Sequence, residues 1–155
     1  MAALDQINEA RVDAWRSLFQ AHGAVTSRIE RALTGEDLPP VAWFDVLWAL
    51  DRAETGRMRP RALVEHVAVS KSGLTRLLDR LVDAGMVERV SCPKDRRGYE
   101  IAMTEAGDRM LRAMWPVYVR ELDHHFAGID PEEAAMLREL LDRVEASACD
   151  GESVS

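Results

Sequence analysis

The chain has 155 residues, of which 47% are hydrophobic, enough to build one compact domain with a helical annex. The chain has 20 Lys and Arg and 27 Asp and Glu, which give a formal net charge of -7. An acidic total charge does not by itself indicate a nucleic-acid-binding protein. Two cysteines make no disulfide framework, and no apolar run approaches the roughly 20 residues that span a bilayer. We therefore expect a soluble cytoplasmic protein.

The N-terminal half is predicted to be helical. Apolar residues from Leu4 to Leu33 follow helical spacing, and the helix is expected to stop near Gly35. A second helix with a broad apolar surface is predicted over residues 39–50. Pro60 suits the first turn of a short third helix.

The next segment combines a helix with two short strands. Ser70 is predicted to cap a fourth helix, and Gly85 is a natural stop for it. Alternating, β-prone residues predict strands over 87–90 and 99–103, joined by a charged loop. The buried face of the helix is predicted from its i, i+3, i+4 and i+7 spacing, and consists of Leu74, Leu77, Leu78 and Leu81.

Two more helices are predicted after the second strand. Thr104 is expected to cap a fifth helix, which Pro116 should kink. Asp130 to Glu133 resembles a capping box that starts a last helix, and fraying is expected from Ser147. The apolar stripes of the terminal helices exceed what a small central domain can cover, so we expect them to pack against a second copy in a two-fold dimer.

Charge is distributed unevenly along the chain. Residues 57–99 contain ten basic and five acidic side chains, a local charge of 10 − 5 = +5, which leaves −7 − 5 = −12 for the rest. A positive field within an acidic chain can steer phosphates to one face.

The polar face of the fourth helix and the charged loop together suggest a DNA-binding unit. The second helix of a helix-turn-helix enters the major groove with its N-terminal residues, and a basic hairpin tip can enter the minor groove. We expect Asp95 to fix the turn rather than meet phosphate. The predicted DNA-binding residues are Ser70, Lys71, Ser72, Thr75 and Arg76 on the helix and Lys94, Asp95, Arg96 and Arg97 in the wing.

The segment SKSGLTRLLDRLVDAGMVERVSCPKDRRGYEIAMTEAG, Ser70 to Gly107, resembles the MarR-type winged helix-turn-helix regulators. The Asp-x-Arg of the family's wing falls on residues 95–97, and Met103-Thr104 replaces the usual Leu-Thr. The resemblance implies a mainly α fold with a small β-wing, flanked by terminal dimerisation helices. It also implies a homodimer that binds a pseudopalindromic double-stranded DNA operator, most often as a repressor relieved by a small ligand.

The expected organisation has four parts. Residues 1–35 form an N-terminal dimerisation helix, and residues 38–104 form the winged helix-turn-helix lobe. Residues 105–148 form the C-terminal dimerisation helices, and residues 149–155 form a flexible tail.

The resemblance also implies an effector pocket between the dimer helices and the DNA-binding lobe, and a small aromatic or phenolic molecule is the expected effector. Its candidate lining is Trp15, Phe19, His22, Trp43 and Trp48. Aromatic residues at helical spacing are more often core than ligand contacts, so both interpretations stay open.

The sequence leaves other functions open. In a redox-responsive regulator, Cys92 near the basic loop would be the residue that is oxidised. In a metal-responsive regulator, the ligands would come from His22, His66, His124 or His125. No metal-ligand spacing, nucleophile elbow or phosphate-binding Gly-rich loop is present, so no metal, cofactor or catalytic residue is predicted. A helical dimerisation module that does not bind DNA is the remaining alternative.

Overall fold

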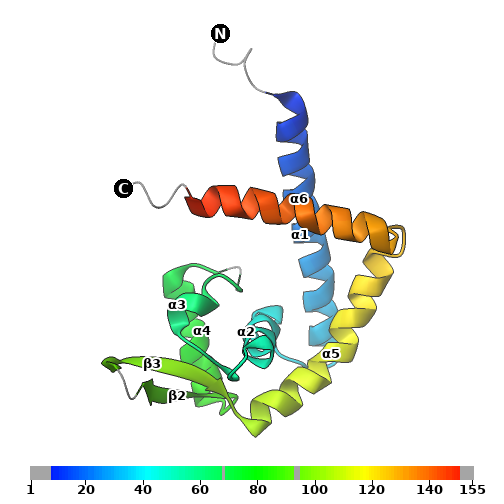
Figure 1. Ribbon diagram of the computed structural model, residues 1–155. Helices are drawn as coiled ribbons and strands as arrows, with labels where there is room; N and C mark the ends of the chain where they lie inside the picture. Colours follow the sequence, from blue (N-terminus) through cyan, green and yellow to red (C-terminus); the bar gives the residue numbers. More distant parts are fainter. Residues whose placement is uncertain (1–7, 68, 93–94, 151–155) are drawn as a thin grey trace. The chain divides into compact units, whose positions relative to one another are not determined.

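The computed structural model describes residues 8–67, 69–92 and 95–150 (Figure 1). It has the expected class, mainly helical with one small antiparallel sheet, and contains two compact units, Met1–Glu121 and Leu122–Ser155. The helices are α1 (Glu9–Gly35), α2 (Val41–Arg52), α3 (Pro60–Leu63), α4 (Lys71–Asp83), α5 (Glu105–His125) and α6 (Pro131–Asp150), and the strands are β1 (Arg57–Met58), β2 (Val87–Cys92) and β3 (Asp95–Met103).

The first two helices both have a polar side chain that accepts a hydrogen bond at their N-terminus; this side chain belongs to a neighbouring residue for α1 and to another helix for α2. Asn8 caps α1, because its side-chain oxygen accepts a hydrogen bond from the Arg11 amide at 3.3 Å. No local side chain caps α2; instead, the Val41 amide donates to Glu30 Oε1 of α1 at 3.1 Å. Leu4, where the predicted helical pattern began, lies outside the described residues.

Helix α4 begins and ends as its sequence predicts. The Gly73 amide donates to Ser70 Oγ at 3.1 Å, so the predicted cap is confirmed. Gly85 has a φ of +72°, and the Met86 amide donates to the Leu81 carbonyl at 2.9 Å, which closes the helix in a Schellman motif. All four leucines of the predicted buried face are at most 2% exposed.

The sheet has three strands in the order β1-β3-β2, and both pairings are antiparallel. The prediction of two strands was incomplete, because β1 has only two residues, Arg57 and Met58, and shows no alternating pattern of its own. The predicted loop of residues 91–98 was too long. Strand β2 runs to Cys92 and β3 begins at Asp95, so cross-strand hydrogen bonds extend the hairpin outward.

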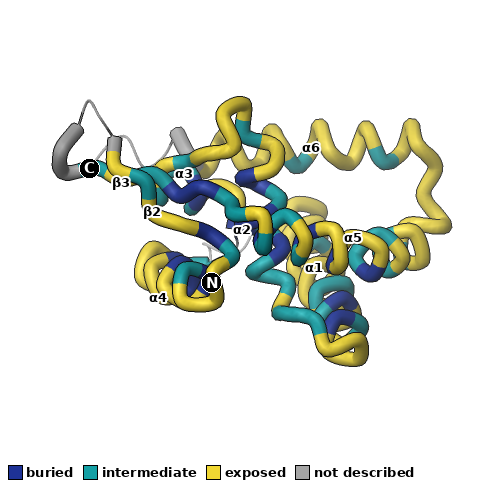
Figure 2. Tube along the Cα trace, turned by 90° about the horizontal axis from the view of Figure 1, so that it is seen from below, coloured by how far each residue is buried: buried dark blue, intermediate teal, exposed yellow. Residues whose placement is uncertain are grey.

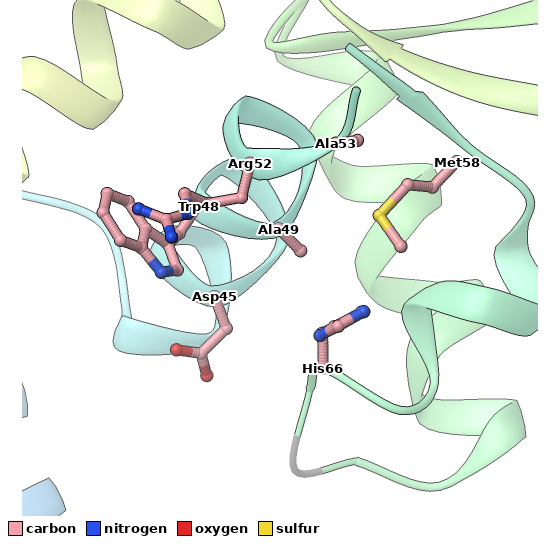
Figure 3. A pocket seen from close by; sticks show the side chains of 7 residues that line it. All are labelled: Asp45, Trp48, Ala49, Arg52, Ala53, Met58 and His66. Carbon is pink, nitrogen blue, oxygen red and sulfur yellow. The ribbon is translucent and has the colours of Figure 1, made fainter. Parts of the chain in front are cut away.

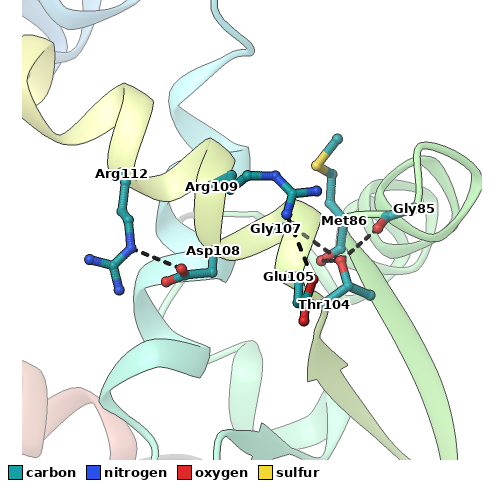
Figure 4. Close-up of polar contacts among 8 residues, drawn as sticks. All are labelled: Gly85, Met86, Thr104, Glu105, Gly107, Asp108, Arg109 and Arg112. Carbon is teal, nitrogen blue, oxygen red and sulfur yellow. Dashed lines mark hydrogen bonds and ion pairs between the residues drawn. The ribbon is translucent and has the colours of Figure 1, made fainter.

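Thr104 fastens the start of α5 to the end of α4 (Figure 4). Its hydroxyl is 2.6 Å from the Gly85 carbonyl and 3.0 Å from the Met86 carbonyl, and it accepts a hydrogen bond from the Gly107 amide at 3.1 Å, which confirms the predicted cap. Gly107 allows this close approach, since a Cβ there would lie 2.1 Å from the Met86 oxygen. The C-terminal end of α4 and the N-terminal end of α5 are thus one packed junction.

The core of the first unit is formed by α2, α4, the sheet and part of α5 (Figure 2). Phe44, Leu47 and Leu50 of α2 are at most 1% exposed, as are Ile101 of β3 and Met114 of α5. By contrast, only the last third of α1 contributes buried residues. This core fixes α4 and the hairpin relative to each other.

Helix α6 starts with the predicted capping box. Asp130 Oδ1 accepts hydrogen bonds from the Glu132 and Glu133 amides, each at 2.8 Å, and the Asp130 amide donates to Glu133 Oε2 at 3.0 Å. The helix continues through Ser147 to Asp150, beyond the point where we expected it to fray.

Candidate nucleic-acid interface

The polar face of α4 is exposed along its first two turns. Ser70, Lys71, Ser72, Thr75 and Arg76, the five predicted contact residues, are all exposed. All three hydroxyls already have partners. Ser70 Oγ accepts the capping hydrogen bond and lies 3.2 Å from Ser72 Oγ, and Thr75 Oγ1 donates to the Lys71 carbonyl at 3.2 Å. The Ser70 oxygen is therefore mainly structural, whereas Lys71 and Arg76 are the side chains whose charge can meet a ligand.

The cations of α4 differ from those of the later helices in their pairing. Within the described residues, Lys71, Arg76 and Arg80 take part in no ion pair. Arg112 on α5, by comparison, donates to Asp108 Oδ2 at 2.8 Å, and Arg120 donates to Glu36 Oε1 at 2.9 Å. Charges that are not neutralised within the protein can displace counterions from a polyanion. The positive field predicted from the sequence is thus available on this helix.

The wing is the β2–β3 hairpin. Its basic end begins at Lys94, which lies outside the described residues, and continues with Asp95, Arg96 and Arg97 at the start of β3. The described backbone pairs Cys92 with Asp95, so these residues occupy the end of the hairpin. The side chains from Cys92 to Arg97 lie outside what the structure describes.

One cluster links α4 to this hairpin. Arg89 of β2 forms an ion pair with Asp79 of α4, and its guanidinium carbon lies 5.5 Å from the centre of the Tyr99 ring of β3. The hydrogen bond to Asp79 raises the pKa of Arg89 above its ordinary value. No local sequence pattern predicts this cluster, because Asp79, Arg89 and Tyr99 follow one another at intervals of ten residues.

A cavity of about 340 Å³ lies beside α2 (Figure 3). Asp45, Trp48, Ala49, Arg52 and Ala53 line it from α2 and its end, and Met58 and His66 line the other side. The Arg52 guanidinium carbon lies 5.4 Å from the centre of the Trp48 ring. The cavity therefore combines an aromatic wall with a cation, a carboxyl group and an imidazole.

Asp45 is the most perturbed acid of this region. Burial and, to a smaller extent, the nearby Glu30 carboxylate together raise its pKa from 3.8 to about 6. Burial, with a contribution from Asp45, also raises the pKa of Tyr118. A carboxyl group with a pKa near 6 exchanges a proton near neutral pH, so it can donate or accept a hydrogen bond.

Aromatic side chains connect this cavity to α5. The Trp48 and Trp115 rings stack with their centres 4.7 Å apart, and the Phe44 and Tyr118 rings stack at 4.0 Å. Trp115, which the sequence left unassigned, thus packs against a residue that lines the cavity.

Of the five predicted effector residues, only Trp48 lines this cavity. Trp15, Phe19 and His22 are exposed on α1, and Trp43 is partly buried on α2. Sequence reasoning missed Asp45, Arg52, Met58 and His66. Asp45 could have been found from the sequence, because it is a lone acid within the apolar run Val41–Leu50.

The described residues offer no metal-binding cluster for the metal-responsive alternative. Among the described residues, no three His, Cys, Asp or Glu side chains gather in a metal-binding arrangement. The rings of His124 and His125 contact each other edge to face, with their centres 5.0 Å apart. No helix of the described chain is long and apolar enough to cross a membrane.

Comparison with known proteins agrees with this architecture. The model of the MarR family matches residues 36–98. The HTH-type transcriptional repressor IacR of Pseudomonas putida is 28% identical over 127 residues, which cover 82% of this chain and 74% of that protein.

Solved structures match over most of the chain. AbsC, a MarR family transcriptional regulator from Streptomyces coelicolor, aligns with a TM-score of 0.78 and 28% identity over 94% of this chain and 97% of its own. Sco3205, a MarR family regulator of the same organism solved in complex with DNA, aligns with a TM-score of 0.79 and 25% identity over 91% and 89%. The chain, with its capped α4 and antiparallel wing, is therefore similar to transcriptional regulators of the MarR family.

Proposed function

We propose that this protein is a ligand-responsive repressor that binds a pseudopalindromic DNA operator as a homodimer. The observation that carries the proposal is the exposed start of α4, where Lys71 and Arg76 have no ion-pair partner among the described residues, next to a hairpin whose end is basic. IacR is a repressor and Sco3205 was solved with DNA, which supports the same function here. A protein with this function acts on DNA in the cytoplasm.

The DNA contacts are divided between two elements. Thr75 and Arg76 of α4 read the major groove, and Arg76 can fork onto a guanine edge. Arg97, with Arg96, neutralises phosphates beside the minor groove. Ser70, Lys71, Ser72 and Lys94 add backbone contacts, and Asp95 fixes the turn.

The dimer is proposed from the exposed apolar stripes of the terminal helices. On α1, Val12, Trp15 and Phe19 are 41%, 61% and 69% exposed at i, i+3 and i+7 spacing. On α6, large apolar side chains from Met136 to Val144 are also exposed. Stripes of this kind mark interaction surfaces. Matching surfaces on a second copy bury them in an isologous interface, which supplies two α4 helices for the two halves of an operator.

The effector site is proposed at the cavity beside α2. Trp48 provides a surface on which an aromatic ring stacks, Arg52 binds an anionic group, and Asp45 orients a hydroxyl. A small aromatic or phenolic molecule fits this chemistry. Arg52→Ala should abolish relief of repression by such a molecule while the ligand-free variant keeps its operator affinity, because Arg52 is exposed and lies outside α4.

The decisive experiment is selection of genomic DNA fragments by the purified protein, followed by affinity measurements on the selected site across a salt series. Arg97→Ala should weaken binding and flatten the log–log salt dependence by roughly one unit for each lost phosphate contact. Arg112→Ala, which removes an arginine that is paired with Asp108, is the matched control and should behave as wild type. If no fragment is enriched while the protein remains dimeric, the chain is a dimerisation module instead.

Redox or metal responses are the alternatives for the regulating signal. Cys92 would carry the first, but its side chain lies outside what the structure describes. Operator binding that is unaffected by peroxide and by Zn²⁺ but lost with an aromatic ligand would decide for the small-molecule effector.

A further inference from the structure

The ion pair between α4 and the hairpin lies where the proposed DNA contacts of the two elements must be aligned. Asp79 follows Thr75 by four residues and Arg76 by three, so it shares their face of α4. A carboxylate on a face that approaches phosphates opposes binding unless it is neutralised. Arg89 of β2 provides that neutralisation through its ion pair with Asp79.

The sheet register explains why Arg89 points toward α4. Arg89 lies opposite Ile101, which is fully buried, so both side chains are on the core face of the sheet. Tyr99 lies opposite Ser91 and is the diagonal neighbour of Arg89 on that same face. Its ring packs against the guanidinium at 5.5 Å, which restricts the arginine side chain.

Along the hairpin, this cluster lies between the buried end and the tip. Val87, which pairs with Met103 and is 2% exposed, anchors the inner end to the core, whereas Cys92 and Asp95 form the last described pair at the outer end. Between these two points, the Asp79–Arg89 pair is a direct link from hairpin to helix, and Tyr99 is only two residues from Arg97.

We propose that Asp79 and Arg89 are positioning residues that hold the wing at a fixed angle to α4, and that the Tyr99 ring supports them by packing against the Arg89 guanidinium. The proposal rests on the proposed function, because it assigns these residues to the alignment of two DNA-binding elements. The side chains of Arg89 and Asp79 are 41% and 51% exposed, and exposed ion pairs contribute little to global stability. Their effect should therefore be seen in the wing and in DNA binding rather than in folding.

The substitution Asp79→Asn distinguishes this positioning role from the electrostatic repulsion between the Asp79 carboxylate and DNA. Removing a negative charge from a DNA-binding face should by itself tighten binding, and it would also free Arg89 for phosphate. A positioning role gives the opposite result, a loss of about tenfold in operator affinity, because the wing contacts are no longer aligned. Asp83→Asn is the matched control, since Asp83 is an exposed acid of the same helix with no ion pair within the described residues. It should not weaken binding.

The double variant Asp79→Asn with Arg97→Ala tests whether Asp79 affects operator affinity through the wing. If Asp79 acts through the wing, Arg97→Ala should cost no more than about twofold in the Asp79→Asn background, although it weakens wild-type binding strongly. Full additivity of the two losses would overturn the proposal, as would Asp79→Asn binding that equals or exceeds that of wild type.

Hydrogen exchange of the DNA-free protein tests the same inference without any operator. Asp79→Asn should accelerate amide exchange in β2 and β3 several-fold and leave the first turns of α4 unchanged. Unchanged exchange in the hairpin would overturn the positioning role. If the wild-type protein selects no operator, the proposed function fails on that result, while accelerated hairpin exchange still supports the link between Asp79 and Arg89.

Discussion

Asp45 should make the protein's stability depend on pH, and Asp45→Asn should remove that dependence. Burial raises the pKa of this carboxyl group from 3.8 to about 6. Between these two values the folded protein binds the proton more tightly than the unfolded chain, so stability from this group falls as pH rises from about 4 to 6. Above pH 6 the carboxylate is charged in both states, and the cost of burying it stays constant.

The magnitude follows from the shift. From 3.8 to about 6 is a change of roughly 2 pKa units, and each unit corresponds to 1.36 kcal/mol, which gives at most about 3 kcal/mol. Asp45 is only partly buried, so solvent screening should reduce the effect to about 1–2 kcal/mol. Asparagine has the same shape and no charge. Asp45→Asn should therefore be more stable than wild type by this amount at about pH 7.5, and nearly equal to it at about pH 4.

Urea denaturation at several pH values, at one fixed protein concentration, measures the difference. Asp51→Asn controls for the loss of a negative charge, because Asp51 is exposed on the same helix. The stability difference between Asp45→Asn and wild type should rise between about pH 4 and pH 6 and then level off. A difference that stays flat, or a variant less stable than wild type at neutral pH, would refute the description of Asp45 as a desolvated carboxyl group.

Three further predictions concern the rest of the molecule. Thr75→Ala and Arg76→Ala should weaken operator binding with little change in melting temperature, and discrimination at one base pair should fall by about 1–3 kcal/mol if Arg76 contacts guanine, as competition with mutated operators will show. Gly107→Ala should destabilise the fold by about 3 kcal/mol in urea unfolding, because its Cβ would lie 2.1 Å from a backbone oxygen, whereas Gly23→Ala, with open space around it, should not destabilise. Deletion of residues 1–20 should give an aggregating or unfolded protein in size-exclusion chromatography, and a folded monomer that still binds a full operator would contradict the dimer.

Local features of the helices could be predicted because their causes lie within a few residues. The Ser70, Thr104 and Asp130 caps, the Gly85 stop and the leucine face of α4 each depend on spacings of at most seven residues, and the structure confirms all of them. The order of a capped amphipathic helix followed by a basic hairpin was enough to indicate the fold class and the similarity to MarR family regulators.

Strand β1 shows where the sequence was insufficient. Its two residues have no periodicity, and they are extended because Arg57 and Met58 pair with Ala102 and Ile101, more than forty residues later. The cavity beside α2 has the same character, since Asp45 and His66 come from separate elements. The effector prediction took aromatic residues expected between the dimer helices and the DNA-binding lobe, and it included Trp15 and Phe19, which are exposed on α1 and do not line this cavity.

The sequence by itself determined the helices, their ends, the buried face of α4 and the basic character of the wing, because backbone propensity, capping and amphipathic spacing act between near neighbours. Tertiary structure alone decided that Glu30 caps α2, that Thr104 fastens α5 to the end of α4, and that Arg89 meets Asp79 beside Tyr99. These contacts join residues about ten to twenty positions apart along the chain. No local pattern encodes them, because they form only when packing of the core brings the separate elements together.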